Sequence, residues 1–195
     1  MASSEIRAGL PILAFADAKA LGDWLEQAPS ASPGLWLKLA KHGSGHASLS
    51  RDEAIDAALC HGWIDGQLNP YDGDWWLIRF TPRTRRSKWS QKNRERAQQL
   101  IAQGRMTPRG LAAVEAARAD GRWDAAYASA SRAEIPADLQ AALDANPAAA
   151  AFFATLTGAN RYAVLYRIGA VKRAETRARK IAEFVAMLER HETLH

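Results

Sequence analysis

The chain has 195 residues with a formal net charge of +5, and its 48% hydrophobic content with seven tryptophans excludes extended disorder. The single cysteine, Cys60, excludes an intrachain disulfide framework and a cysteine-based zinc site. We find no secretory signal pattern and no run of about 18 apolar residues, so we expect a cytoplasmic protein without membrane insertion.

The first part of the chain predicts strands and helices in alternation. An apolar run at Leu10–Phe15 indicates a strand, and apolar residues at helical spacing indicate a helix over residues 16–27. Leu35–Lys41 indicates a second strand. The capping box at Ser50–Glu53 opens a helix that ends near Gly62.

Two further strands, Trp63–Leu68 and Trp75–Phe80, are joined by turn-forming residues and predict a hairpin. Alternation assigns Ile64 and Leu68 to the core side, together with Trp76, Ile78 and Phe80. The opposite face would then bring together Trp63, Asp65, Gln67, Trp75 and Arg79. Aromatic walls with a carboxylate, an amide and a guanidinium suit a small pocket. The alternative is a second packed layer in which an arginine neutralises Asp65.

The segment from Arg79 to Arg109 is strongly basic. It holds ten of the 26 Lys and Arg residues and one acid, Glu95, whereas residues 1–78 carry a net charge of −5. This asymmetry predicts either an anionic partner or an internal ion-pair network.

Within this segment, Ser90 predicts the start of a helix that ends near Gly104. The helix N-terminus and the loop before it favour an anion, which Arg83, Arg86 and Lys88 would hold. Neutralisation of the acidic first part by a surface loop explains the same residues equally well. The apolar stripe of the helix includes Trp89, Asn93, Ala97, Leu100 and Ile101, so the Asn93 amide either fixes the loop or faces a cleft.

The second half is predicted to be helical. Thr107-Pro108 begins a helix that ends near Gly121. After it we expect helices at residues 136–145, 146–157, 160–170 and 175–190. The predicted fold is α+β: a small, mainly antiparallel sheet with helices in residues 1–130, followed by an all-α region in residues 131–195.

Three functions remain open. The first is a non-enzymatic binding protein for an anionic small molecule or protein, with no cofactor and no metal. Its site would contain Trp63, Asp65, Gln67, Arg79, Arg83, Arg86, Lys88, Trp89 and Asn93. The second is an enzyme on a small anionic substrate, with Asp65 or His61 as acid/base and Arg79 as clamp. The third is nucleic-acid binding, against which stand the modest total charge and the absence of a recognisable motif. The oligomeric state is left open.

Three segments resemble the bacterial YdeI/OmpD-associated (bacteriocin-protection) family: ALCHGWIDGQ, RFTPRTRRSKWSQKNRERAQQLIAQGRMTPRG and FFATLTGANRYAVLYRIGAVKRAETRARKIAEFVAML. The resemblance extends over about residues 10–190. It implies that the last part of the chain is a helical domain. It also implies a role in protection against bacteriocins or cationic antimicrobial peptides and an association with an outer-membrane porin. The resemblance implies no catalytic residues.

Overall fold

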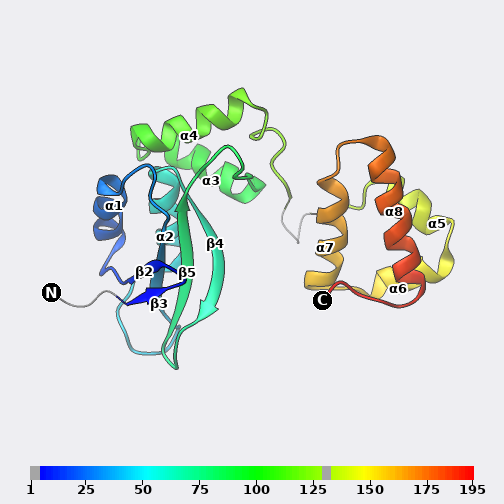
Figure 1. The fold of residues 1–195 in the computed structure, drawn as a ribbon, viewed down its shortest axis with the longest axis horizontal. Coiled ribbons are helices and arrows are strands. Elements are labelled where there is room, and N and C mark those ends of the chain that lie inside the picture. The colour runs from blue at the N-terminus through cyan, green and yellow to red at the C-terminus, as the bar shows by residue number, and fades with distance from the viewer. Residues whose placement is uncertain (1–4, 129–132) are drawn as a thin grey trace. The chain divides into compact units, whose positions relative to one another are not determined.

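The computed structural model describes residues 5–128 and 133–195 (Figure 1). The chain divides into two compact units, one ending at Ala126 and the other beginning at Tyr127. The boundary predicted between residues 130 and 131 lies outside the described residues. Each unit has its own hydrophobic core.

The N-terminal unit contains a five-stranded sheet in the order β1-β2-β3-β5-β4. Its strands are β1 (Ile6–Arg7), β2 (Leu10–Leu13), β3 (Leu35–Ala40), β4 (Trp63–Pro70) and β5 (Trp75–Pro82). Strands β2 and β3 are parallel, and the other neighbours are antiparallel. This mostly antiparallel sheet confirms the predicted α+β class. Strand β1 was not predicted, because two residues are too few for a periodic pattern.

The helices of this unit are α1 (Ala18–Gln27), α2 (Arg51–Cys60), α3 (Gln91–Ala102) and α4 (Pro108–Ala119). The last three begin at the polar residues that the sequence indicates as caps, Ser50, Ser90 and Thr107. In α2 the Ser50 hydroxyl accepts from the Glu53 N–H at 3.2 Å, and the Glu53 carboxylate accepts from the Ser50 N–H at 2.7 Å. These bonds satisfy backbone donors that a helix start leaves unpaired, so the helix begins at a defined residue.

One face of the sheet is packed on these helices. The main core joins Leu35, Leu37 and Phe80 of the sheet to residues such as Leu21 and Leu59 of the helices. The other face carries a smaller cluster of Leu10, Trp36 and Leu77, to which none of the described helices contributes a residue. We call the second face the helix-free face.

The hairpin of β4 and β5 has a different register from the predicted one. Asp65 lies opposite Phe80 and Leu68 lies opposite Ile78, with a bulge between the two pairs. Directly opposed residues share a face, so Asp65 and Leu68 both lie on the core side. The predicted common face of Asp65 and Arg79 is therefore wrong: the bulge interrupts the alternation on which it rested.

The C-terminal unit is helical, with α5 (Ala137–Asp144), α6 (Pro147–Thr155), α7 (Gly158–Gly169) and α8 (Ala174–Glu189). Its core includes Leu139, Phe153, Ile168 and Leu188. No helix within the described residues is long and apolar enough to cross a membrane.

Candidate functional site

The aromatic pocket predicted on the hairpin is not formed. Trp63 is fully buried in the main core, where its ring meets Trp24 edge-on at 5.9 Å. Asp65 lies on the same side of the sheet, with its carboxylate 3.6 Å from the guanidinium of Arg51. Arg79 lies on the helix-free face, opposite Trp36 of β3. Asp65 and Arg79 thus neither share a pocket nor neutralise each other.

The residues of the enzymatic alternative are also separated. His61 ends α2, and its Nδ1 lies 2.9 Å from the Glu26 carboxylate on the helical side of the unit. Arg79 is on the other side of the sheet. The neighbouring thiol of Cys60 is buried, and this burial raises its pKa. Since the thiolate is the nucleophilic form, burial makes Cys60 less reactive.

Much of the basic segment is used inside the N-terminal unit. Arg109 donates to three carbonyls at the end of α1, those of Leu25, Glu26 and Ala28, at 3.2, 3.1 and 2.9 Å. This places a cation at the negative end of a helix whose last turn contains no basic residue.

Arg96 of α3 is paired with two acids of α2, Asp52 at 3.0 Å and Asp56. Hydrogen bonding and charge from Arg96 lower the pKa of the Asp52 carboxyl. The internal ion-pair network, one of the two predicted alternatives, is therefore present for this part of the segment.

Arg83 and Trp89 are structural residues. The Arg83 guanidinium stacks 3.6 Å above the Trp89 ring, and its Nε donates to the Trp63 carbonyl at 3.2 Å. Its Nη1 also donates to the Lys88 carbonyl at 3.3 Å. Trp89 is buried and packs edge-on against Trp123 at 4.8 Å. Arg83 therefore fixes the loop to the core and Trp89 offers no open wall to a ligand.

The loop beyond Arg83 forms a fixed turn. The Thr84 N–H donates to the Ser87 hydroxyl at 3.0 Å, and the Ser87 N–H donates to the Thr84 carbonyl at 3.0 Å. Arg122 donates to the carbonyls of Thr84 and Ser87 at 3.3 and 2.9 Å. Arg122 is itself paired with Asp120 at 2.8 Å, which lowers the pKa of that carboxyl.

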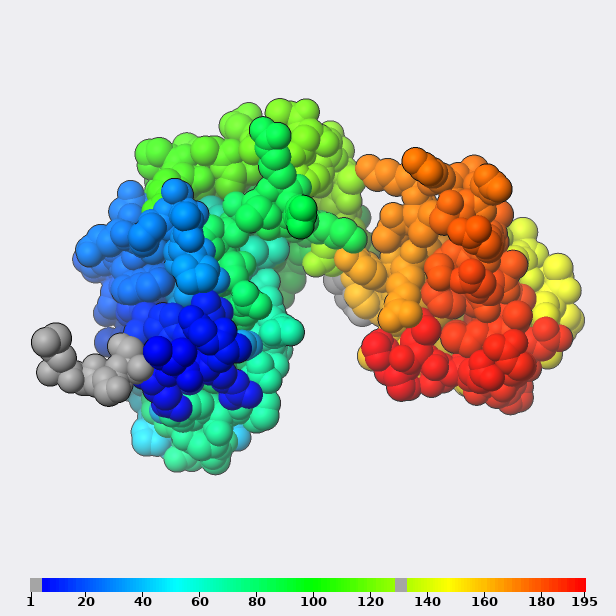
Figure 2. Space-filling view, viewed as in Figure 1, coloured from blue at the N-terminus to red at the C-terminus, as the bar shows by residue number. Residues whose placement is uncertain are grey.

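This turn presents basic side chains to solvent. Arg85, Arg86 and Lys88 are exposed, and we call residues 84–88 the cationic turn. In Figure 2 side chains of the green part of the chain, where β5 leads into α3, stand out from the surface. Arg86 and Lys88 were predicted from the sequence, but Arg122 was not. Its contacts with Ser87 and Thr84 span 35 and 38 positions of the chain and therefore leave no local pattern.

The other predicted site residues lie on β4, β5 and α3, outside the cationic turn as defined. Gln67 is exposed at the bulge of β4. Asn93 is half-buried in the first turn of α3, where its N–H donates to the capping hydroxyl of Ser90 at 3.1 Å. Arg79 is half-buried, and its Nε is buried without a hydrogen-bond partner.

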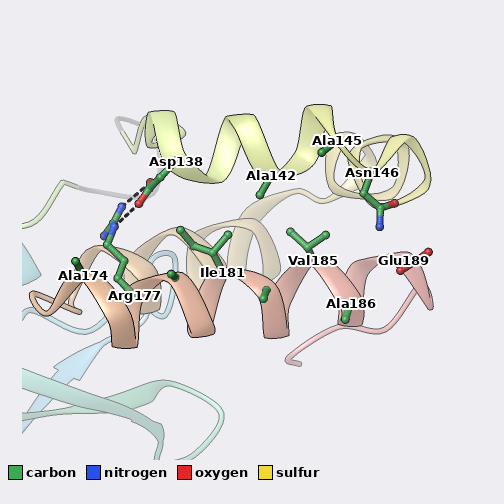
Figure 3. Close-up of a pocket in the computed structure, with 12 residues that line it drawn as sticks. Asp138, Ala142, Ala145, Asn146, Ala174, Arg177, Ile181, Val185, Ala186 and Glu189 are labelled. Atoms are coloured by element: carbon green, nitrogen blue, oxygen red, sulfur yellow. Dashed lines mark hydrogen bonds and ion pairs between the residues drawn. The ribbon is translucent and has the colours of Figure 1, made fainter.

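The C-terminal unit has a groove of about 610 Å³ between α5 and α8. Alanines such as Ala142, Ala178 and Ala182 line much of it, and the ion pair of Asp138 with Arg177, at 2.6 Å, lies at one end (Figure 3). None of the predicted site residues lies in this groove.

Comparison with known proteins assigns the two parts of the chain to different families. Residues 13–113, more than half of the chain, match a domain of unknown function, DUF8412. Residues 132–191 match the family described as bacteriocin-protection, YdeI or OmpD-associated, so that resemblance holds for the C-terminal part rather than for residues 10–190. No curated protein and no solved structure matches the chain. The chain therefore belongs to the DUF8412 family, and its C-terminal part is similar to the YdeI or OmpD-associated family.

Proposed function

We propose that this protein is a non-enzymatic binding protein whose cationic turn holds an anionic small molecule or an anionic surface of a protein partner. One observation carries the proposal. Arg85, Arg86 and Lys88 are exposed together on one turn, and the turn itself is held by hydrogen bonds.

The fixed backbone of the turn supports this proposal. A flexible basic loop loses conformational entropy when it binds, which weakens the complex. In the cationic turn, Thr84 and Ser87 bond to each other and Arg122 holds both of their carbonyls. Arginine side chains on such a turn offer paired donors to phosphate or carboxylate groups.

The description of the C-terminal family supports a biological setting for this binding. We propose that the protein contributes to protection against bacteriocins or cationic antimicrobial peptides by binding an anionic cell component, not by chemistry on a substrate. We further propose that it acts in the cytoplasm, a reducing compartment with which the lone buried thiol of Cys60 is compatible. Fractionation of cells that carry the tagged protein tests the location.

A thermal-shift screen tests the anion site. The ligands are phosphorylated metabolites, nucleotides, short nucleic acids and acidic peptides. The proteins are the wild type, an Arg85→Gln/Arg86→Gln variant and a Lys19→Gln/Arg118→Gln variant, which loses the same charge elsewhere on the N-terminal unit. An anion bound by the cationic turn raises Tm in the wild type and in the second variant but not in the first.

Two outcomes would contradict the proposal. One is an unchanged Tm with every anion, and the other is an equal rise in all three proteins. A hit restricted to nucleic acids, with affinity that falls steeply as salt increases, would favour the nucleic-acid alternative over a small ligand or a protein partner.

A further inference from the structure

The helix-free face of the sheet carries a second group of cations, separate from the cationic turn. We propose that Arg79, together with the bulge at Gly66 and Gln67, binds the oxyanion of a small ligand. Phosphate monoesters are the ligand class that we assign to it.

Arg79 has an unsatisfied donor. Its side chain is half-buried, and among the described residues its Nε is buried without a hydrogen-bond partner. A buried donor without an acceptor costs free energy, and for a charged group this cost is higher than for a neutral one. Asp65 on the adjacent strand cannot satisfy Arg79, since Asp65 lies on the core side of the sheet. The Nε and one Nη of a guanidinium form a fork that matches two oxygens of a phosphate.

The bulge places two residues of β4 beside Arg79. Because Asp65 pairs with Phe80 and Leu68 pairs with Ile78, both Gly66 and Gln67 lie opposite Arg79. A bulge interrupts the hydrogen bonds between strands, and β4 is the edge strand of the sheet.

Gly66 has no side chain to fill the position beside Arg79. A Cβ built on Gly66 would meet only the Arg79 carbonyl oxygen at 3.7 Å and the Arg79 Cβ at 3.9 Å, both ordinary contacts. Gln67 is exposed and adds an amide donor next to this space.

Two other cations on this side are held by aromatic rings and have no ion pair with a carboxylate among the described residues. The Lys38 ammonium lies 4.1 Å from the Tyr71 ring centre and 4.9 Å from that of Trp75. The Arg7 guanidinium lies 5.8 Å from the Trp36 ring centre. Glu5, one of the acids at this end of the sheet, accepts a hydrogen bond from the Tyr71 hydroxyl at 2.5 Å. Rings hold the cations in place without cancelling their charge, so the face keeps a potential that attracts anions.

Nuclear magnetic resonance of the arginine Nε–H groups tests the site directly, with inorganic phosphate as the probe. In the wild type, phosphate shifts the Arg79 Nε–H signal and the backbone amides of Gly66 and Gln67, with one common saturation curve. In Arg79→Gln the amide shifts require at least tenfold more phosphate, because the charged fork is gone. Arg118→Gln, which removes an exposed arginine of α4, binds as the wild type does.

A second variant keeps Arg79 and blocks the space beside it. Gly66→Leu places a side chain there, at a position without a positive backbone φ. We expect phosphate binding to weaken while Tm stays close to that of the wild type. Shifts of the amides that persist in both Arg79→Gln and Gly66→Leu, or no saturable shift in the wild type, would overturn the proposal.

Two more measurements distinguish phosphate binding at Arg79 from binding at the cationic turn and from carboxylate binding. We expect the Arg85→Gln/Arg86→Gln variant to bind phosphate at Arg79 as the wild type does, because the two sites are independent. Failure of one proposal therefore leaves the other standing. Acetate replaces phosphate in a parallel titration. Tighter binding of acetate would contradict the assignment to phosphate monoesters.

Discussion

At the scale of single residues, neighbouring arginines of one loop have opposite roles. Arg83 is stacked on Trp89 and donates to the Trp63 carbonyl, whereas Arg86 is exposed on the cationic turn. We predicted both in one anion site, because no local feature of the sequence distinguishes Arg83 from Arg86. Only the position of the buried Trp89 ring, set by the core, distinguishes them.

We predict that Arg83→Ala lowers the free energy of unfolding by about 2 kcal/mol, since it removes a stacked cation and its hydrogen bonds. Arg86→Ala should change it by less than about 0.5 kcal/mol, as for an exposed side chain. Urea denaturation followed by tryptophan fluorescence measures both. Equal stability of the two variants would show that Arg83 is not a structural residue.

At the scale of elements, α4 approaches the end of α2 closely because Gly110 has no side chain. The Thr107 hydroxyl donates to the Cys60 carbonyl at 2.8 Å, which brings the first turn of α4 against α2. A Cβ on Gly110 would lie 2.1 Å from that carbonyl oxygen, a distance that real atoms do not tolerate. The sequence predicted α4 from Thr107 and Pro108 but could not show why a glycine follows them.

We predict that Gly110→Ala lowers the free energy of unfolding by about 1–3 kcal/mol, because backbone must move to admit the methyl group. Gly169→Ala is the matched control: it is also a helical glycine, at the end of α7, with nothing within 4 Å of the added carbon. Chemical denaturation of both variants should show a loss for the first and no loss for the second. A neutral Gly110→Ala would mean that α4 can shift away from α2 without cost.

Also at this scale, the β4–β5 hairpin shows what the alternation of side chains along a strand predicts correctly and what it does not. The two strands lie where the sequence predicts them. Their side chains do not all lie on the predicted faces of the sheet, because a bulge at Gly66 and Gln67 shifts the alternation by one residue. A glycine inside a strand pattern is the one sequence signal for such a bulge.

At the scale of the whole molecule, each of the two units has its own main core. One is shared by the sheet and α1–α4, and the other belongs to α5–α8. The two family matches fall on either side of the same division. Such units fold alone when each buries enough apolar surface.

We predict that residues 1–126 and residues 127–195 each fold when expressed separately. Calorimetry should show one cooperative transition for each fragment, with a Tm within a few degrees of a transition in the full chain. The C-terminal fragment is the more demanding test, since a domain of this size is marginal in stability. A fragment without a cooperative transition would show that its fold depends on the rest of the chain.

Sequence patterns were sufficient to predict the α+β class, most of the helices and strands, the caps that begin α2, α3 and α4, and the resemblance of the C-terminal part to its family. These follow from local patterns, in which the interacting residues lie within a few positions of one another.

Which cations of the basic segment bind inside the fold depends on tertiary contacts. Arg96 and Arg109 are bound to residues 40 or more positions earlier in the chain, and Arg122 fixes a turn 35 positions before it. Contacts over such separations depend on how the sheet and helices pack. From the sequence, these bases could therefore form a binding surface or an internal network. In the folded protein, some of them form the internal network and others are exposed.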